Sequence, residues 1–336
     1  MSQRVGRPQR SYLGKGKLEE LADLADRHQA SVVMLNDELT PAQQRIVEDA
    51  VQVKVIDRTA LILDIFAGRA LTKEGRLQVE LAQHEYLLPR LAGQWSHLER
   101  LGGGIGTRGP GETQIETDRR LIRRRIQRLK AQLEEVRTHR ALYRQRRKKQ
   151  GIPVVSLIGY TNAGKSTLFN VVSKADSVVQ DRLFATLDPV TRRARLPSGK
   201  PFLLTDTVGF IHKLPAAVVA AFRATLEELG DADLLLHVVD ATHPNASEQA
   251  RVVEQTLKEM GLGARASVVA LNKVDLLVPR HADGDDLEAA LAPVRDRLCG
   301  PEQPTALVSA ARGWGIDTLL SLVEASLERT AAPAVG

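Results

Sequence analysis

A glycine-rich loop with the spacing G-x-x-x-x-G-K-S runs from Gly159 to Ser166. The apolar run Val154–Ile158 precedes it, and an apolar helical pattern that begins at Leu168 follows it. A strand, a glycine loop and a helix in this order form a phosphate-binding loop, because the loop N–H groups and the positive end of the helix surround an anion. Alternating strand and helix patterns continue to Glu328, so residues 151–330 are predicted to form a doubly wound α/β domain.

The residues of this loop have separate expected roles. Lys165 is expected to reach the β- and γ-phosphates of a nucleotide, and the Ser166 hydroxyl is expected to bind Mg²⁺. A glycine turn beside an unrelated lysine is the alternative, and the flanking strand and helix argue against it. The other predicted nucleotide-binding residues of the loop are Gly159, Tyr160, Thr161, Asn162, Ala163, Gly164 and Thr167.

A second apolar strand pattern, Phe202–Thr205, ends in Asp206-Thr207-Val208-Gly209. Beside a phosphate-binding loop, such a sequence places a carboxylate near Mg²⁺ and a glycine N–H near the γ-phosphate. We expect Asp206 to hold Mg²⁺ through water and Gly209 to contact the γ-phosphate, with Thr207 and Val208 in the same nucleotide site.

Two further strand ends predict which base the site accepts. The run Val268–Leu271 is followed by Asn272-Lys273-Val274-Asp275. The Asp275 carboxylate can accept both N1–H and N2–H₂ of guanine, and adenine has no such donor pair, so this motif selects GTP over ATP. The next strand pattern ends in the small turn Ser309-Ala310-Ala311, whose Ala310 N–H we expect to bind the guanine carbonyl.

The positive charge of the chain is concentrated in one segment. The chain has 336 residues and a net charge of +6, but residues 119–149 contain fourteen Lys or Arg and two Glu, a local charge of +12. Like charges at i,i+4 destabilise a helix, so contact with RNA phosphates explains this segment better than a solvated face. The candidate RNA-binding residues are Arg108, Arg119, Arg120, Arg123, Arg124, Arg125 and Arg128.

Two helical patterns flank a glycine-rich stretch. Gly102–Gly111 contains six glycines and a proline, which favour neither helix nor strand. We predict an antiparallel helical hairpin over residues 71–150 with this stretch as its tip, and Pro89 as a point where the first helix kinks. The apolar seams of the two helices are Leu77, Leu81, His84, Leu88, Leu91 and Trp95, and Ile122, Ile126, Leu129, Leu133 and Val136.

Residues 1–70 are predicted to form a small α/β unit. Helical spacing marks Lys17–Gln29, and the apolar runs Ser31–Leu35 and Val51–Ile56 predict two short strands. Thr40-Pro41 predicts a helix start between them, and Thr59–Arg69 predicts a further helix. After the hairpin and the α/β domain, residues 331–336 are predicted to be a tail.

Composition excludes several classes of protein. One cysteine, Cys299, excludes a disulfide framework or a multi-cysteine metal site and fits a reducing cytoplasm. Met1–Arg10 lacks the apolar segment of a secretory signal, and no apolar run reaches the ~18 residues of a membrane span. We therefore expect a cytoplasmic monomer, with peripheral membrane association left open.

The chain resembles the HflX family of ribosome-associated GTPases along almost its whole length. The resemblance implies a Ras-like P-loop GTPase domain preceded by a small α/β domain and a long helical hairpin. The chain starts about ten residues before the family's first matching segment and ends soon after the GTPase domain. We therefore expect a separate C-terminal domain to be missing or minimal. The matching segments are Ser11–Leu21, Val55–Leu63, Gly102–Arg120, Gly159–Ser166, Phe184–Pro189, Asp206–Pro215, Ala221–Glu228 and Asn272–Asp275.

The resemblance also assigns the segment between the two phosphate-contacting motifs. From chemistry alone, Thr186 and Thr191 are both candidates to supply a hydroxyl to Mg²⁺. The resemblance selects Thr186, beside Ser166, so that Lys165, Thr186 and Gly209 are the predicted catalytic residues. It adds Phe184, Ala185, Leu187 and Asp188 to the nucleotide site.

The resemblance implies a function as well. Members hydrolyse GTP, bind the large ribosomal subunit with the hairpin tip directed at ribosomal RNA of the peptidyl transferase centre, and split stalled or idle ribosomes under stress. Two alternatives stay open: an RNA-binding assembly factor for the large subunit that uses GTP as a timer, and an RNA-remodelling ATPase that works through the N-terminal domain. In that domain the glycine-lysine cluster Gly14–Lys17 is more simply a turn before a helix.

Two positions bear on hydrolysis. Ras-like enzymes place a water-positioning glutamine after Asp-x-x-Gly, but Phe210 stands here and cannot hydrogen-bond water. We therefore expect slow hydrolysis until a partner, the ribosome, completes the site. Asn162 is compatible with a K⁺ ion near the phosphates, as in related GTPases, or with a left-handed turn alone, and both readings stay open.

Overall fold

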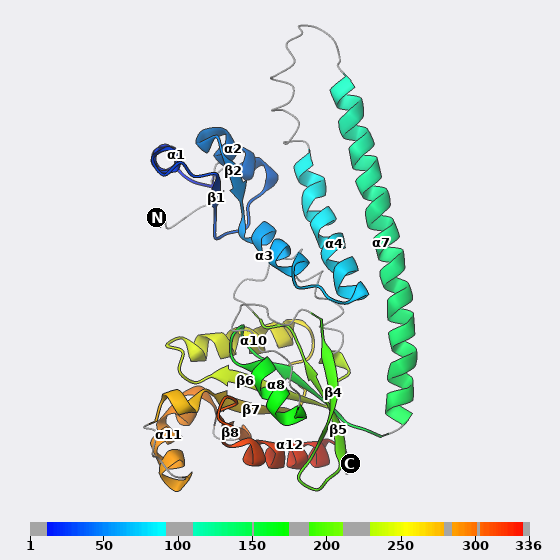
Figure 1. The fold of residues 1–336 in the computed structure, drawn as a ribbon, viewed down its shortest axis with the longest axis vertical. Helices are drawn as coiled ribbons and strands as arrows, with labels where there is room; N and C mark the ends of the chain where they lie inside the picture. The colour runs from blue at the N-terminus through cyan, green and yellow to red at the C-terminus, as the bar shows by residue number, and fades with distance from the viewer. Residues whose placement is uncertain are drawn as a thin grey trace. The chain divides into compact units, whose positions relative to one another are not determined.

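The computed structural model describes residues 12–91, 110–149, 151–174, 188–210, 229–278, 284–300 and 303–331. The chain divides into two compact units (Figure 1). We call Met1–Val136 with Pro215–Ala221 the N-terminal unit, and Arg137–Leu214 with Phe222–Gly336 the C-terminal unit. The long helix α7 (Pro110–Lys149) contributes to both. The domain boundaries suggested at residues 70 and 150 stay predictions.

The described part of the N-terminal unit contains a parallel βαβ arrangement. Strand β1 (Val32–Met34) pairs with β2 (Lys54–Ile56), and helix α2 (Pro41–Val51) connects them. The Thr40 hydroxyl accepts the Gln43 N–H at 3.2 Å, and the Gln43 side chain accepts the Thr40 N–H at 3.0 Å, which starts α2 where the sequence predicts. Helix α1 (Lys15–Arg27) packs against α2.

The second strand is shorter than the sequence predicts. The run Val51–Ile56 suggests a strand, but α2 continues through Val51 and the chain turns at Gln52, whose φ of 55° is left-handed. Strand β2 begins only at Lys54. The prediction fails because a buried helix end and a buried strand have the same apolar signature over a few residues.

Helices α3 (Arg58–Ala67), α4 (Lys73–Leu87) and α7 follow in the described part of this unit. Asp57 caps the N-terminus of helix α3, and helix α4 passes into the 3₁₀ turn η1 (Leu88–Arg90). Pro89 interrupts the α-helix there because it has no N–H to donate. Helices α4 and α7 run antiparallel (Figure 1), as predicted, and the pairs Glu80–Arg125 at 2.6 Å and Glu85–Lys130 at 2.8 Å join them.

The seam of α4 differs in part from its prediction. Leu77 is buried, as are Ile126 and Leu129 of α7. Leu81, His84, Leu88 and Leu91 are only half-buried, whereas Val79, Ala82 and Tyr86 are buried instead. Helix α3 also packs against α4, so the buried stripe of α4 faces two neighbours rather than one.

The predicted hairpin tip is described only at its end. Trp95 and residues 101–109 lie outside the described residues. Pro110 and Gly111, predicted as part of the tip, instead begin helix α7. A proline is tolerated there because the first N–H groups of a helix have no partner within the helix.

The C-terminal unit contains a six-stranded sheet with the order β4-β5-β3-β6-β7-β8. All neighbouring strands are parallel except β4 and β5. The strands are β3 (Val154–Ile158), β4 (Val190–Arg195), β5 (Pro201–Asp206), β6 (Leu234–Asp240), β7 (Ser267–Asn272) and β8 (Thr305–Leu307). The helices are α8 (Lys165–Ser173), α10 (Ala246–Glu259), η2 (Val274–Leu276), α11 (Gly284–Leu298) and α12 (Ile316–Ala331).

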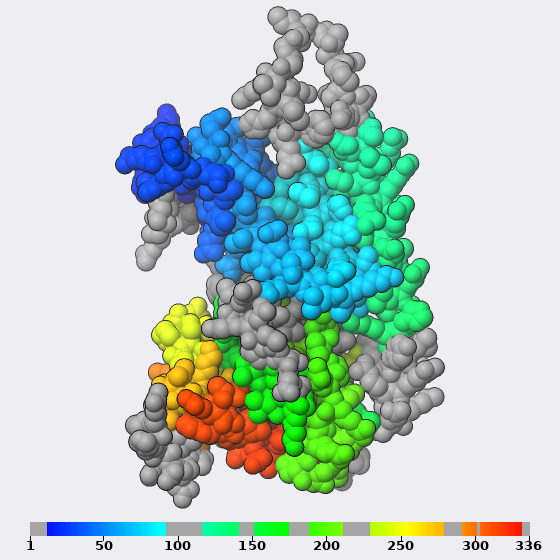
Figure 2. Space-filling view, in the orientation of Figure 1, coloured from blue at the N-terminus to red at the C-terminus, as the bar shows by residue number. Residues whose placement is uncertain are grey.

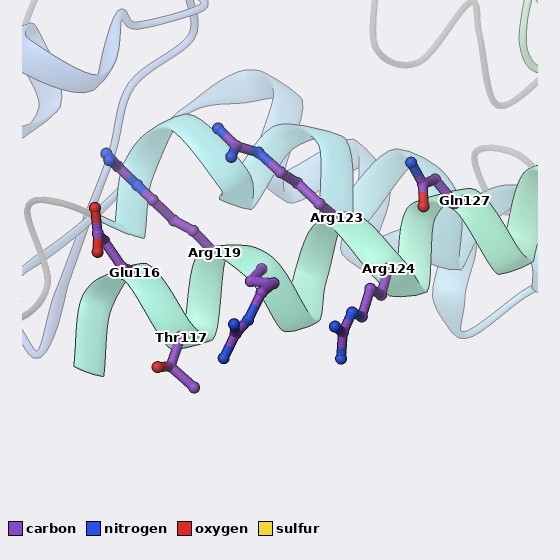
Figure 3. Close-up of a pocket in the computed structure, with 7 residues that line it drawn as sticks. Glu116, Thr117, Arg119, Arg123, Arg124 and Gln127 are labelled. Carbon is purple, nitrogen blue, oxygen red and sulfur yellow. The ribbon is translucent and has the colours of Figure 1, made fainter. Parts of the chain in front are cut away.

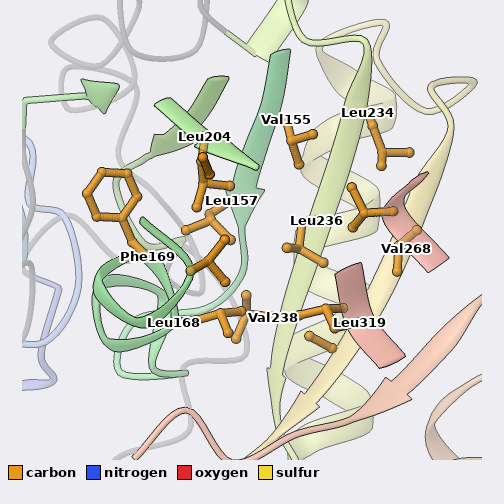
Figure 4. Packing of buried hydrophobic residues seen from close by; sticks show 14 of the residues in the cluster. Val155, Leu157, Leu168, Phe169, Leu204, Leu234, Leu236, Val238, Val268 and Leu319 are labelled. Atoms are coloured by element: carbon orange, nitrogen blue, oxygen red, sulfur yellow. The ribbon is translucent and has the colours of Figure 1, made fainter. Parts of the chain in front are cut away.

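Helices cover both faces of this sheet, which confirms the predicted doubly wound fold. Val268 and Ala270 of β7 pack with α8 and α12, whereas the alternating Val269 and Leu271 pack with α10 and α11. Figure 4 shows the first of these clusters, in which Phe169 of α8 lies against the strands. Strands buried on both faces are typical of parallel sheets, and ligands bind at their carboxyl ends.

None of the helices in the described residues is both long and apolar enough to cross a membrane.

Candidate functional site

The phosphate-binding loop lies between the carboxyl end of β3 and the first turn of α8. Gly159 has φ 147° and Gly164 has φ 93°, backbone conformations that glycine adopts without strain. A Cβ at Gly159 would overlap the Val238 carbonyl oxygen, and a Cβ at Gly164 would overlap the Asn272 side chain. Both glycines are therefore required by close packing as well as by backbone conformation.

Lys165 is buried beneath this loop. Its Nζ donates to the carbonyl oxygens of Gly159 at 3.1 Å and Tyr160 at 2.8 Å. Burial disfavours the ammonium form and lowers the pKa of Lys165 to about 8, although the nearby Asp206 carboxylate opposes this. Two carbonyl contacts hold the ammonium in a position from which phosphate oxygens can replace them.

His237 of β6 lies close to this cation and is 4% exposed. Burial and the charge of Lys165 lower the pKa of His237 to about 4, so its imidazole is neutral at physiological pH. The neutral form adds no second positive charge beside Lys165.

Ser166 and Asp206 meet at the expected metal position. The Ser166 hydroxyl donates to Asp206 Oδ2 at 2.8 Å, and both groups are oxygen donors of the kind that Mg²⁺ prefers. The donor set therefore fits Mg²⁺. Phe184, Ala185, Thr186 and Leu187 lie outside the described residues, and Asp188 directly precedes the β4 segment. The other candidate, Thr191, lies in β4, where its hydroxyl shares a 2.9 Å hydrogen bond with Thr205.

The segment after β5 is joined to the phosphate-binding loop. The Thr161 N–H donates to the Phe210 carbonyl at 2.8 Å, and the Phe210 N–H donates to the Gly159 carbonyl at 3.0 Å. A Cβ at Gly209 would lie 2.8 Å from Thr161 Cα and 3.0 Å from Lys165 Nζ, so only glycine fits there without displacement. Thr207 is buried and donates to the Leu157 carbonyl at 2.5 Å, and Val208 is also buried.

Phe210 is 3% exposed and packs with Ile158 and Leu235, on the α10 side of the sheet. Its side chain is held in the core and offers no hydrogen bond to a water molecule.

Asn272 has a bracing role that sequence reasoning missed. Its Nδ2 donates to the Ala163 carbonyl at 2.9 Å, and its Oδ1 accepts the Ala310 N–H at 3.0 Å. One buried amide thus connects the phosphate-binding loop to the turn that contains Ser309, Ala310 and Ala311. In this structure the Ala310 N–H donates to Asn272 Oδ1, so the expected guanine carbonyl would have to compete for the same N–H.

Asp240 is a second residue that sequence reasoning missed. It ends β6 beside Asn272, and its Oδ2 pairs with Lys273 Nζ at 2.7 Å. Burial alone would raise the pKa of Asp240, but hydrogen bonds from Lys273 and Thr242 outweigh it and lower that pKa. The Lys273 side chain is thereby held at the carboxyl end of the sheet. The available signal in the sequence was a single aspartate at the end of an apolar strand pattern.

The next two residues of this motif lie in η2. Val274 is buried, and Asp275 is half-buried within the turn. Lys273 has φ 67°, so the chain turns sharply between the bracing Asn272 and the predicted base-contacting Asp275.

Six of the seven predicted RNA-binding arginines lie on α7, and Figure 3 labels three of them, Arg119, Arg123 and Arg124. A cavity of about 680 Å³ is lined by Glu116, Thr117, Arg119, Arg120, Arg123, Arg124 and Gln127. Arg119 and Arg123 project to one side of the helix, and Arg124 projects to another (Figure 3). Arg128 is exposed, whereas Arg125 is half-buried and donates to Glu80 at 2.7 Å, which ties it to α4. Arg108 lies outside the described residues.

Three family models match the chain in succession. Residues 1–67 match the N-terminal region of GTP-binding GTPases, residues 69–147 match their middle region, and residues 154–273 match 50S ribosome-binding GTPases. A solved GTP-binding protein from Sulfolobus solfataricus in complex with GDP is 24% identical, with a TM-score of 0.51 over 97% of this chain and 89% of that one. At this identity the likeness supports the fold alone.

Relatives of known family are much more similar in sequence. GTPase HflX of Caldanaerobacter subterraneus subsp. tengcongensis is 52% identical over 94% of this chain and 70% of its own length. GTPase HflX of Escherichia coli K12 is 51% identical over 79% of this chain and 62% of its own length. The chain thus spans about two thirds of these relatives. The family resemblance and the GTPase class expected from the motifs are confirmed: the chain belongs to the HflX family of GTPases.

Proposed function

We propose that this chain binds the large ribosomal subunit through helix α7 and splits stalled or idle ribosomes into subunits, with GTP controlling the interaction. The observation that carries the proposal is the group of arginines around the α7 cavity, of which Arg120, Arg123 and Arg124 are exposed. Four arginines against the single carboxylate of Glu116 make this surface positive, which favours the phosphates of RNA. The match to 50S ribosome-binding GTPases supports ribosomal RNA as that partner. The RNA near the peptidyl transferase centre is the proposed contact, and the cytoplasm is the proposed location.

The proposed nucleotide site follows from the contacts of the loop. The N–H groups of the loop between Gly159 and Gly164 would surround the phosphates, and the Lys165 ammonium would exchange its two carbonyl partners for phosphate oxygens. Gly209 brings its N–H to the same place because it lies against Lys165. Ser166, Thr186 and, through water, Asp206 would hold Mg²⁺, which neutralises phosphate charge when bound.

Hydrolysis is proposed to depend on the ribosome. The buried Phe210 cannot position the attacking water, so a partner must order it. Asn162 has φ 63°, which supports the left-handed turn as the reason for an asparagine. Comparing hydrolysis rates in K⁺ and Na⁺ tests whether Asn162 also serves a K⁺ ion.

Base selectivity is tested by replacing Asp275→Asn. Loss of the carboxylate removes the acceptor for two guanine donors, and we expect GTP affinity to fall by about 100-fold or more. Xanthosine triphosphate, which carries a carbonyl in place of the guanine amino group, should then bind better than GTP. The exposed Asp296→Asn serves as the matched control. Unchanged GTP affinity in Asp275→Asn would remove this residue from the base site.

The role of α7 is tested by a variant with Arg119, Arg120, Arg123 and Arg124 all changed to Gln. We expect its affinity for large subunits to fall by about tenfold or more at physiological salt, and the slope of log affinity against log salt to become shallower by up to about 4. The matched control removes four exposed charges elsewhere, at Arg27, Arg45, Arg251 and Lys258. Sedimentation with purified subunits measures both, and equal losses in the two variants would contradict a specific role of α7.

Ribosome splitting is tested by sedimentation of intact ribosomes with the chain and either GTP or a non-cleavable analogue. Free subunits with both nucleotides support splitting on binding, with hydrolysis serving release. Binding to large subunits without any free subunits would favour the assembly-factor alternative. ATP hydrolysis that survives Lys165→Ala would favour the RNA-remodelling alternative.

A further inference from the structure

Strand β4 forms one edge of the sheet in the C-terminal unit. Among the described strands it pairs only with β5, and it stands first in the strand order. Residues 190–200 contain three arginines and one lysine but no acidic residue. Arg192, Arg193 and Arg195 are exposed, and we call them the basic edge. The β4–β5 hairpin lies at the surface in Figure 2.

The strand itself is firmly held. Ala194 is buried in the cluster under α8 and α12 together with Phe202 and Leu204. Side chains alternate along a strand, so Arg193 and Arg195 are directed to the opposite face of the sheet. The apolar clusters under α10 and α11 include no residue of β4 or β5 in the described part of the chain. Leu203, the register partner of Arg193, is accordingly only half-buried.

The charges on this face are not neutralised by neighbouring acids. Arg195 Nη1 donates to the Gly199 carbonyl at 3.2 Å, and Lys200 pairs with Glu328 at 3.2 Å. Within the described residues, no carboxylate forms an ion pair with Arg193 or Arg195. Two guanidinium groups on a rigid, open strand face fit phosphate oxygens, which they can bind in pairs.

A simpler explanation for charged side chains on β4 is that they prevent this edge strand from pairing with another chain. Any charged side chain meets that need, and lysine is the residue that edge strands favour for it. Edge protection does not explain why all three charged residues of the basic edge are arginines. The basic edge also adjoins the proposed phosphate site, because β4 pairs with β5, which ends at Asp206. Strand β4 follows Thr186 and Asp188 closely, and Thr191 is hydrogen-bonded to Thr205, one residue before Asp206.

We infer that the basic edge is a second RNA-binding surface, which takes the phosphate backbone of ribosomal RNA and couples that contact to GTP hydrolysis. The inference rests on the proposed function, because it names a further contact with the same ribosomal partner. RNA bound at β4 would restrain this strand and, through the β4–β5 pairing, the strand that ends at Asp206. The ribosome would thus order the residues around the γ-phosphate. This would supply the positioning of the attacking water that Phe210 cannot provide.

The test uses the full chain with Arg193→Gln and Arg195→Gln together. We expect affinity for purified large subunits to fall several-fold, by about tenfold at most, and the salt slope to become shallower by about 2. At saturating subunits the stimulated GTPase rate should fall as well, while the unstimulated rate and GDP affinity stay at the wild-type level. The matched control is Arg27→Gln with Arg251→Gln, two exposed arginines outside the basic edge.

A charge-conserving variant separates charge from structure. Arg193→Lys with Arg195→Lys should keep most of the salt slope and lose part of the stimulation, because lysine retains the charge but not the paired donors. Protein-free RNA from the large subunit serves as a second probe. Weaker binding of the Gln variant to subunits but not to this RNA would indicate a ribosomal protein as the partner and overturn the inference.

The two proposals fail differently. A wild-type chain that does not bind large subunits refutes the proposed function and with it the basic edge as a ribosomal contact. Wild-type and Gln-variant chains that bind and respond alike, while the α7 variant is impaired, refute the basic edge alone.

Discussion

Replacing Lys165→Ala should lower GTP hydrolysis by about 10²–10³-fold, measured at saturating large subunits. The variant removes the one ammonium group that the loop places against both Gly159 and Gly209. Nucleotide-dependent stabilisation should disappear with it: ~2.7 kcal/mol is expected for a wild-type chain at a GDP concentration of 100 Kd. A thermal shift with and without GDP measures this loss.

The pH dependence of the nucleotide-free chain gives an independent check. The pKa of Lys165 is lowered from its ordinary value of 10.5 to about 8 in the folded chain, so the unfolded chain binds this proton more tightly. The wild-type chain should therefore gain stability as pH rises from about 8 towards 10.5, while the full cost of burying the ammonium is present below pH 8. Lys165→Ala removes that cost and should flatten this part of the profile.

The matched control is Lys174→Ala, which removes an exposed lysine just after α8. It should leave GDP stabilisation and the pH profile unchanged. Retained GDP stabilisation in Lys165→Ala would show that the loop does not bind the nucleotide through this residue.

Replacing Asp57→Ala should destabilise the N-terminal unit by about 3–5 kcal/mol, the largest stability effect we expect. Asp57 is 1% exposed and accepts hydrogen bonds from the Leu39 N–H at 3.1 Å, the Ala60 N–H at 2.8 Å and the Tyr86 hydroxyl at 2.8 Å. The Arg90 Nη2 lies 3.5 Å from its Oδ2. Without the carboxylate, these donors lose their buried acceptor, and the Arg90 guanidinium loses the negative charge beside it.

Arg90 makes this arrangement a junction between distant segments. Its guanidinium lies 3.5 Å from the centre of the Tyr86 ring and donates to the Leu39 carbonyl at 2.6 Å and to Gln44 at 3.0 Å. Burial, together with the Asp57 charge, raises the pKa of Tyr86 far above its ordinary value, so the hydroxyl remains a donor. Asp57 therefore stabilises the contact between the end of α4 and the βαβ arrangement.

Hydrogen exchange resolved by segment is the suitable measurement, because a chain of two units need not unfold in one step. The matched control, Asp49→Ala, removes an exposed carboxylate whose Arg45 partner is 4.0 Å away, and should cost less than about 0.5 kcal/mol. GDP affinity should be unaffected by either change. Equal protection of β1 and β2 in the two variants would contradict the role of Asp57.

Local patterns were sufficient for much of the fold. The phosphate-binding loop, the strands that precede Asp206 and Asn272, and the helix start at Thr40 are each encoded within about ten residues, and the structure has them where expected. The predictions fail where packing against neighbouring elements determines the structure. Val51 extends a helix instead of starting a strand, and α4 buries Tyr86 rather than Leu88 because it packs against two helices.

The sequence by itself determined the order of strands and helices, the positions of the glycines at the loop and the family. Only the tertiary structure decided which polar groups meet across the chain: Asp57 with Arg90, Asp240 with Lys273, and Asn272 with both Ala163 and Ala310. Backbone conformation and apolar periodicity are local properties and can be read from adjacent residues. A hydrogen bond between residues that are 33 or 109 positions apart depends on packing of whole elements, which no local pattern records.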